Sequence, residues 1–130
     1  MTGNGVDELL QAGLAHHRAG RGDAASECYQ KILETTPKHA DANHLLGVIA
    51  LQAERWDEAE KLIETALASN DQSAPFHDHM GVIRRNLGDI VEAEAAHRRA
   101  LALDPKAASA HNNLATTLRQ AGRMNEARDA

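Results

Sequence analysis

Cysteine, aromatic residues and long apolar runs are all scarce in this chain of 130 residues. Cys28 is the only cysteine, so the chain forms no internal disulfide and offers no cysteine cluster for zinc. Tyr29, Trp56 and Phe76 are the only aromatic residues. This scarcity disfavours a β-sandwich, which prefers aromatic and β-branched side chains, whereas the abundant alanine and leucine favour closely packed helices.

Positive charge and membrane signals are also lacking. The formal net charge is −5, so no net positive field draws the chain to nucleic acid or to an anionic membrane. No stretch reaches the ~18 consecutive apolar residues of a membrane span. The N-terminal segment MTGNGVDELL has no basic region followed by an apolar run, so it does not read as a signal peptide. We therefore expect a cytoplasmic protein with no nucleic-acid or membrane partner.

Small residues recur every 34 residues and indicate an internal repeat. The repeated positions are Ala25, Ala59, Ala93 and Ala127; Gly13, Gly47, Gly81 and Ala115; and Leu33, Leu67 and Leu101. Antiparallel helices approach closely only where small residues occupy their crossing point. We therefore expect each glycine to face the alanine that follows it by twelve residues.

The apolar spacing within each unit predicts two helices joined by a tight turn. The expected helices cover residues 6–19, 23–36, 40–53, 56–69, 74–87, 90–103 and 108–121, and the fourth unit breaks off within its second helix, 124–130. The turn slot of the repeat holds Gly20, Glu54, Gly88 and Gly122. A disordered tail is expected over residues 1–5, followed by a repeat domain over 6–130 with units 6–39, 40–73, 74–107 and 108–130 (partial).

The pattern resembles the tetratricopeptide repeat, with Leu-Gly early in the unit, Ala in mid-unit, Ala-Leu late and a closing Pro. The segments that carry the resemblance are HLLGVIALQAERWDEAEKLIETAL, HMGVIRRNLGDIVEAEAAHRRALALDP and HNNLATTLRQAGRMNEARDA. This resemblance implies an all-α fold, a right-handed superhelix (α-solenoid) of antiparallel helix hairpins. Three full repeats and a truncated fourth are expected.

The resemblance further implies a binding scaffold without catalytic activity, whose concave face is formed by the first helix of each unit. The residues expected to bind a protein or peptide there are Leu10, Leu14, His17, His44, Leu45, Val48, Leu51, Asp78, His79, Val82, Arg85, Asn112, Asn113, Thr116 and Arg119. The first part of this set is largely apolar and the second is polar. A bound peptide would place an apolar side chain on the first part and a carboxylate or carbonyl groups against Arg85 and Arg119.

The same residues allow other interpretations. The leucines pack against one another and the arginines are solvated if the face binds nothing. The carboxylate clamp of chaperone-tail-binding repeats is not reproduced, because its lysine slot holds Asp78 and its asparagine slot holds Val82. Replacing Arg85 and Arg119 with alanine is expected to weaken partner capture and to leave helicity unchanged.

Two alternatives to a stand-alone scaffold are considered. The third and fourth units resemble repeat arrays that precede bacterial O-linked N-acetylglucosamine transferases and related transferases. The resemblance allows the chain to be the substrate-recruiting N-terminal part of such an enzyme, with the catalytic domain beyond Ala130. Self-association through the exposed apolar edge of the fourth unit is the other alternative.

The sequence contains no motif that favours a cofactor, a metal ion or catalysis. His77 and His79 are two apart on a helix and point in different directions, so they do not readily share one ion. His77 and His111 hold equivalent slots of successive units and are considered as a pair, as are His44 and His79. No HExxH spacing, phosphate-binding loop or nucleophile turn is present. We expect no enzyme activity, metal or cofactor.

Overall fold

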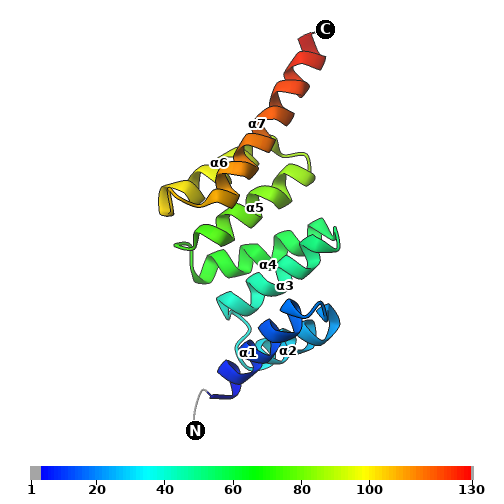
Figure 1. The fold of residues 1–130 in the computed structure, drawn as a ribbon, viewed down its shortest axis with the longest axis vertical. Coiled ribbons are helices and arrows are strands. Elements are labelled where there is room, and N and C mark those ends of the chain that lie inside the picture. Colours follow the sequence, from blue (N-terminus) through cyan, green and yellow to red (C-terminus); the bar gives the residue numbers. More distant parts are fainter. Residues whose placement is uncertain (1–3, 130) are drawn as a thin grey trace. The chain divides into compact units, whose positions relative to one another are not determined.

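The computed structural model describes residues 4–129, with side chains from 5 to 123. Over this range there are seven helices and no strand. Figure 1 shows them in order as α1 Asn4–Arg18, α2 Gly22–Thr35, α3 Ala40–Gln52, α4 Trp56–Ser69, α5 Ala74–Asn86, α6 Ile90–Leu103 and α7 Ala108–Asp129. The predicted all-α fold is confirmed, and the first six expected helices agree with these bounds to within two residues.

The chain divides into two compact units, Met1–Ser69 and Asn70–Ala130. In the first unit, α1 packs on α2, α2 on α3, and α3 on α4. In the second unit, α5 and α6 form a hairpin and α7 contacts both of them. Each unit therefore consists of helix hairpins and the helices stacked on them. The right-handed superhelix through both units stays a prediction.

The turns between paired helices use one slot of the 34-residue repeat. Gly20, Glu54 and Gly88 all have positive φ, at 79°, 61° and 91°. Glycine adopts this conformation without a steric penalty because it has no Cβ. Glu54 has a Cβ, so it adopts this left-handed conformation at a steric cost that glycine avoids. The predicted turn slot is thus confirmed in the first three hairpins.

The fourth unit differs from the prediction. α7 continues without a break to Asp129, so Gly122 is helical and forms no turn, and residue 130 lies outside the described residues. A separate helix over 124–130 would form too few backbone hydrogen bonds to offset the cost of nucleation. Continuation of α7 pairs those backbone groups within one helix.

The expected tail over residues 1–5 also needs correction. Asn4 and Gly5 belong to α1, and residues 1–3 lie outside the described residues. Asp7 lies in the first turn of this helix, where the interaction of its carboxylate with the positive end of the helix dipole stabilises the helix. The helix therefore begins earlier than the repeat pattern indicated.

The regular 34-residue spacing of Gly13, Gly47 and Gly81 has a different packing reason from the one expected. A Cβ at Gly13, Gly47 or Gly81 would overlap a large side chain of the next helix. The overlapping pairs are Gly13 with Tyr29, Gly47 with Ile63, and Gly81 with His97. The nearest atoms thus belong to the residue sixteen positions after each glycine. The prediction that the alanine twelve positions after each glycine is its nearest neighbour is wrong. A large side chain spans the gap between two helices, whereas alanine permits their close approach elsewhere along the crossing.

The interiors of both units combine an apolar core with buried polar residues. In the first, a cluster of Ala25, Tyr29, Ile32, Ala42 and Leu46 forms the core. The Tyr29 hydroxyl is buried there without a hydrogen-bond partner, and burial raises the pKa of its phenol. The buried polar residues are Asn43 and His44 in the first unit, and Asp78, His97 and Thr117 in the second, which has an apolar core as well. Burying such groups is costly unless they are hydrogen-bonded.

Candidate functional site

The predicted binding residues of the first unit are mostly half-buried. They lie on α1 (Leu10, Leu14 and His17) and on α3 (His44, Leu45, Val48 and Leu51). Leu10 and Leu45 pack against the core cluster, and His44 is buried. His17 Nε2 lies 3.2 Å from Gln52 Oε1. Part of the apolar surface expected to receive a ligand is therefore already used in packing α1 and α3.

The predicted binding residues of the second unit lie on α5 and α7, which contact each other. Asn112 and Arg119 are exposed on α7, whereas Asp78 is buried on α5. The half-buried members are His79, Val82, Arg85, Asn113 and Thr116. The structure thus brings the polar part of the predicted face together on two neighbouring helices.

Asp78 accepts hydrogen bonds from two other helices. The His97 ring on α6 has its Nδ1 3.0 Å from Asp78 Oδ1. On α7, the Ser109 hydroxyl donates to Oδ2 at 2.6 Å, and Asn113 Nδ2 lies 3.2 and 3.1 Å from the two oxygens. An ionised carboxylate only accepts, so His97 Nδ1 carries a proton. These contacts tie α5 to both α6 and α7.

His97 extends this network to Arg85. Its Nε2 lies 3.1 Å from Thr117 Oγ1, and Arg85 Nη1 donates to the same oxygen at 3.0 Å. Thr117 Oγ1 therefore contacts both a guanidinium donor and the second nitrogen of the His97 ring. The contacts form a chain from Arg85 through Thr117 and His97 to Asp78. No buried nitrogen or oxygen of these four side chains lacks a partner.

Carboxylate, imidazole and hydroxyl groups in this order resemble a nucleophilic triad. Thr117 and His97 are both 0% exposed, and Thr117 Oγ1 already accepts from Arg85. A substrate atom therefore has no approach to this hydroxyl. We interpret the network as a structural element that holds α5, α6 and α7 together.

The ionisation states around Asp78 follow from its burial and its partners. Burial opposes ionisation of Asp78, but the hydrogen bonds from His97, Ser109 and Asn113 outweigh it and hold the pKa of the carboxyl below its usual range. Burial lowers the pKa of His79, against the opposing effects of Asp78 and the Pro75 carbonyl. At neutral pH Asp78 is therefore ionised and the His79 imidazole is neutral.

Arg85 and Arg119 are not equivalent surface cations. Arg85 Nη1 donates to the Asn113 carbonyl at 3.2 Å as well as to Thr117. Arg119 is exposed, and its Nη2 donates to Thr116 Oγ1 at 3.3 Å. Replacing Arg85 with alanine removes a link between α5 and α7 in addition to a charge. Arg119 is the cleaner probe of binding.

Histidines considered as metal ligands hold loops in place. The same side-chain hydrogen bond to a loop carbonyl recurs every 34 residues, from Asn43 to Pro37 at 3.1 Å, from His77 to Asp71 at 2.8 Å, and from His111 to Pro105 at 2.8 Å. His77 and His111 therefore each use Nε2 within their own loop. Among the described residues, no group of three His, Cys, Asp or Glu side chains is placed to hold a metal ion.

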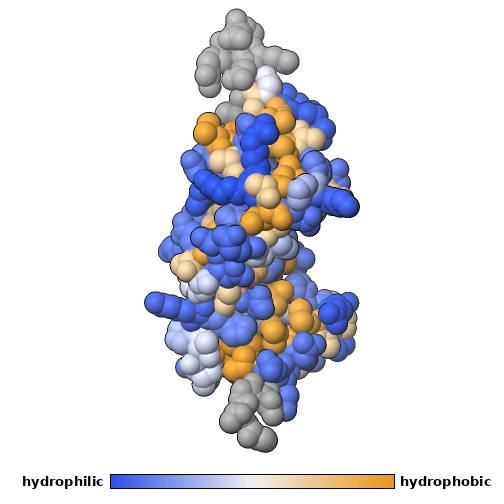
Figure 2. All heavy atoms as spheres, turned by 90° about the vertical axis from the view of Figure 1, so that its left-hand side faces the viewer, coloured by the Kyte–Doolittle hydropathy of each residue, from blue (hydrophilic) through white to orange (hydrophobic). Residues whose placement is uncertain are grey.

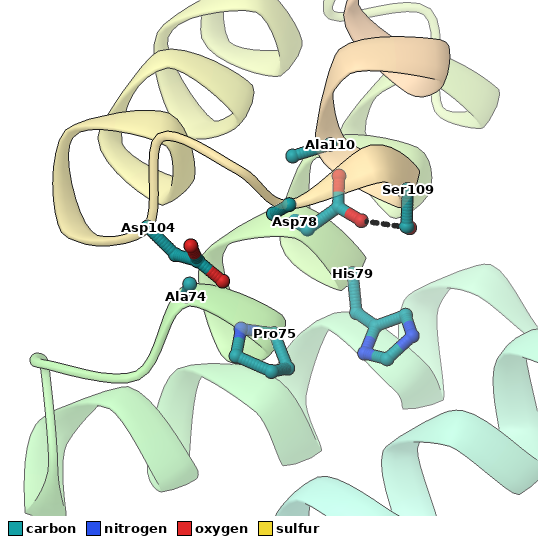
Figure 3. A pocket seen from close by; sticks show the side chains of 8 residues that line it. Ala74, Pro75, Asp78, His79, Asp104, Ser109 and Ala110 are labelled. Carbon is teal, nitrogen blue, oxygen red and sulfur yellow. Dashed lines mark hydrogen bonds between the residues drawn. The ribbon is translucent and has the colours of Figure 1, made fainter.

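A cavity of about 250 Å³ lies between the N-terminal parts of α5 and α7, within the second unit. Its apolar lining is Ala74, Pro75, Ala107 and Ala110, and its polar lining is Asp78, His79, Asp104 and Ser109. Figure 3 shows the Asp104 carboxylate reaching from the α6–α7 loop toward Ala74 and Pro75, while the Asp78 carboxylate points to Ser109. No lysine or arginine is among the described residues that line this cavity.

Exposed apolar side chains form a second kind of surface feature. Figure 2 shows hydrophobic groups reaching one face of the molecule in patches bordered by polar residues. The exposed large hydrophobic residues of the described chain are Leu87, Val91, Leu103 and Leu118. Val91 is the most exposed of them, at 78%, and it lies on α6.

No helix among the described residues is long and apolar enough to cross a membrane.

The sequence interpretation missed His97, Ser109 and Thr117. Ser109, Asn113 and Thr117 follow one another at four-residue steps, which places them along one face of α7. His97 occupies the slot that holds Tyr29 and Ile63 in the earlier units. A histidine in an otherwise apolar core slot, with polar residues stepping along a neighbouring helix, was the available signal.

Family models of the tetratricopeptide repeat match residues 16–81 and 80–130. The chain belongs to the tetratricopeptide-repeat family. A comparison with curated protein sequences gives no match.

Solved structures of tetratricopeptide domains share this fold. The first such domain of Spaghetti (RPAP3), bound to the HSP90 peptide SRMEEVD, superposes with a TM-score of 0.86 at 21% identity, over 94% of this chain and 97% of that one. An O-GlcNAc transferase mutant of Thermobaculum terrenum gives a TM-score of 0.86 at 24% identity, over 88% of this chain and 22% of that one. A MamA mutant gives 0.74 at 29% identity, over 94% and 71%.

Proposed function

We propose that this chain is a non-catalytic cytoplasmic scaffold that binds a peptide or protein segment across α5 and α7. The observation that carries the proposal is that only some of the polar residues on these two helices are used in packing. Their buried polar groups bind one another, while Asn112 and Arg119 remain exposed on the same unit. The fold similarity to a tetratricopeptide domain bound to an HSP90 peptide supports the same assignment.

The chemistry of the face indicates what kind of segment fits it. Val82 offers a half-buried apolar contact on α5, and Asn112 and Arg119 offer donors on α7. Side-chain amides and guanidinium groups bind peptide carbonyls and carboxylates. An extended segment with one apolar side chain and an exposed backbone satisfies both. The lone Cys28 is half-buried and free, which accords with a reducing compartment.

Selection of random peptides displayed on phage against the immobilised chain tests this proposal. We expect selected peptides to lose at least about tenfold in affinity to Arg119→Glu or Val82→Asp, because each change removes a donor or an apolar contact from the face. Val91→Asp is the matched control, since Val91 is an exposed valine on α6. Thermal unfolding identifies any variant that is merely destabilised.

Arg119→Glu keeps the test independent of folding, because the Arg119 side chain is exposed. Peptides whose binding depends on Val91 and is indifferent to both Val82 and Arg119 would place the binding surface on α6 and overturn the proposal.

A further inference from the structure

The cavity between α5 and α7 differs in charge from the exposed part of the face beside it. Its polar lining consists of two carboxylates, one hydroxyl and one imidazole. The rest of the wall is formed by the small side chains of alanine and proline. An apolar wall next to negative charge suits a side chain with an aliphatic stem and a cationic end.

The hydrogen bonds of Ser109 and Asp104 decide what the cavity offers to a ligand. The Ser109 hydroxyl donates its proton to Asp78 Oδ2 and accepts from Asn113 Nδ2 at 3.4 Å, so its oxygen has one lone pair left for a ligand. Asp104 Oδ1 accepts from the Lys106 backbone N–H at 3.2 Å, and the exposed carboxylate has a second oxygen available for a ligand. Both groups therefore act as acceptors.

Asp78 contributes charge and no direct contact. Its two oxygens already accept from His97, Ser109 and Asn113, yet the carboxyl remains ionised because its pKa is lowered. The His79 imidazole is neutral at pH 7 because burial lowers its pKa, so it does not offset this charge. Lys106 lies two residues after Asp104 in the loop but does not line the cavity.

We propose that this cavity binds the lysine side chain of a partner peptide, with the ammonium group on Asp104 and Ser109 and the aliphatic stem against Ala107 and Pro75. The assignment rests on the proposed peptide-binding function and specifies one subsite of it. The subsite selects for positive charge, whereas Arg119 on the neighbouring surface selects for acceptor groups. A segment that bears a lysine next to a carbonyl or carboxylate therefore matches both.

Fluorescence polarisation with three short Gly-Ala peptides tests the subsite. The peptides differ only at a central residue, which is lysine, norleucine or glutamate. We expect the lysine peptide to bind about fivefold more tightly than the norleucine peptide, with the glutamate peptide weakest, because one partly exposed ion pair is worth roughly this factor. Norleucine keeps the stem and lacks the charge.

Asp104→Asn removes the charge and keeps an oxygen for the Lys106 N–H. This variant is expected to abolish the preference for lysine over norleucine. Asp71→Asn is the matched control, because Asp71 is an exposed loop carboxylate of the same unit whose Oδ1 accepts from Gln72. It should leave the preference unchanged.

The two proposals fail separately. Equal binding of the three peptides, no binding by any of them, or a lysine preference that survives Asp104→Asn would overturn the lysine subsite. Phage-selected peptides that still depend on Val82 and Arg119 would then leave the scaffold proposal standing.

Discussion

Tyr29, Ile63 and His97 occupy one slot of the repeat, and each covers the glycine of the preceding helix. Ile63 meets only the steric demand of this slot. Tyr29 adds a hydroxyl that finds no hydrogen-bond partner, whereas both nitrogens of His97 are paired. The side chain in this slot therefore has to fill the space over the glycine. Whether its polar atoms are hydrogen-bonded depends on which partners the neighbouring helices provide.

Asp78→Asn is expected to lower the free energy of unfolding by roughly 2–3 kcal/mol, since a buried hydrogen-bonded charge is replaced by an amide whose NH₂ meets other donors. The Ser109 hydroxyl and the Asn113 amide both donate to Asp78, and in asparagine one of the two acceptor oxygens becomes an NH₂ group that accepts from neither. Urea unfolding monitored by circular dichroism measures the change. Asp104→Asn, at an exposed position, should cost much less, and equal losses would contradict the role given to the buried network.

The sequence predicted that glycines mark a close helix contact but assigned the wrong neighbour. Both the alanine set and the set of Tyr29, Ile63 and His97 repeat every 34 residues, so periodicity does not distinguish them. The distinction depends on side-chain length and on where the two helices cross. Those are properties of the packed hairpin.

At the scale of elements, α7 departs most from the repeat. Gly122 occupies the same slot as Gly20 and Gly88, which have positive φ, and yet it lies inside a continuous helix. Local sequence favours a turn there. The outcome depends on whether the residues after the turn have a surface to pack on, because helical stability in proteins comes mainly from tertiary packing.

Gly122→Ala provides a direct test of this helix. A Cβ at Gly122 meets no atom within 4 Å, so alanine should raise the free energy of unfolding by roughly 0.5–1 kcal/mol. The matched change Gly88→Ala should lower it, because Gly88 has a φ of 91° that alanine rarely adopts. Thermal or urea unfolding of the two variants measures both effects. A loss of stability in Gly122→Ala would show that Gly122 forms a turn.

At the scale of the whole molecule, the pH dependence of stability involves two groups of the second unit whose pKa values are lowered, Asp78 and His79. Asp78 has a lowered pKa, so its contribution to stability is present above the ordinary carboxyl pKa and is lost as the pH falls through the lower folded value. His79 also has a lowered pKa, because the buried imidazole resists protonation. The unfolded chain then takes up this proton first, and stability falls as the pH drops below about 6.5.

His79→Gln is therefore expected to flatten the pH dependence of stability between about pH 7 and pH 5, since glutamine has no proton to gain in this range. The free energy of unfolding of the wild type should fall over this interval by more than that of the variant. Urea titrations at a series of pH values, followed by circular dichroism, provide the comparison. Parallel curves for the two proteins would show that His79 does not contribute to the pH dependence of stability.

The sequence by itself determined the architecture of each unit. The 34-residue spacing of small residues, the apolar periodicity and the turn slot predicted the first six helices, because helix phase and turn conformation depend on neighbouring residues along the chain. The same information predicted that α5 and α7 carry polar residues such as Asp78 and Asn113.

The tertiary structure alone decided what those residues do. Asp78 became a buried acceptor because His97 and Ser109 reach it from other helices, and Arg85 became a structural donor because Thr117 lies opposite. The cavity beside them exists because Ala107 and Ala110 leave space next to Pro75. Such contacts depend on which side chains the packed helices bring within hydrogen-bonding or van der Waals distance, and residue spacing along one chain does not encode them.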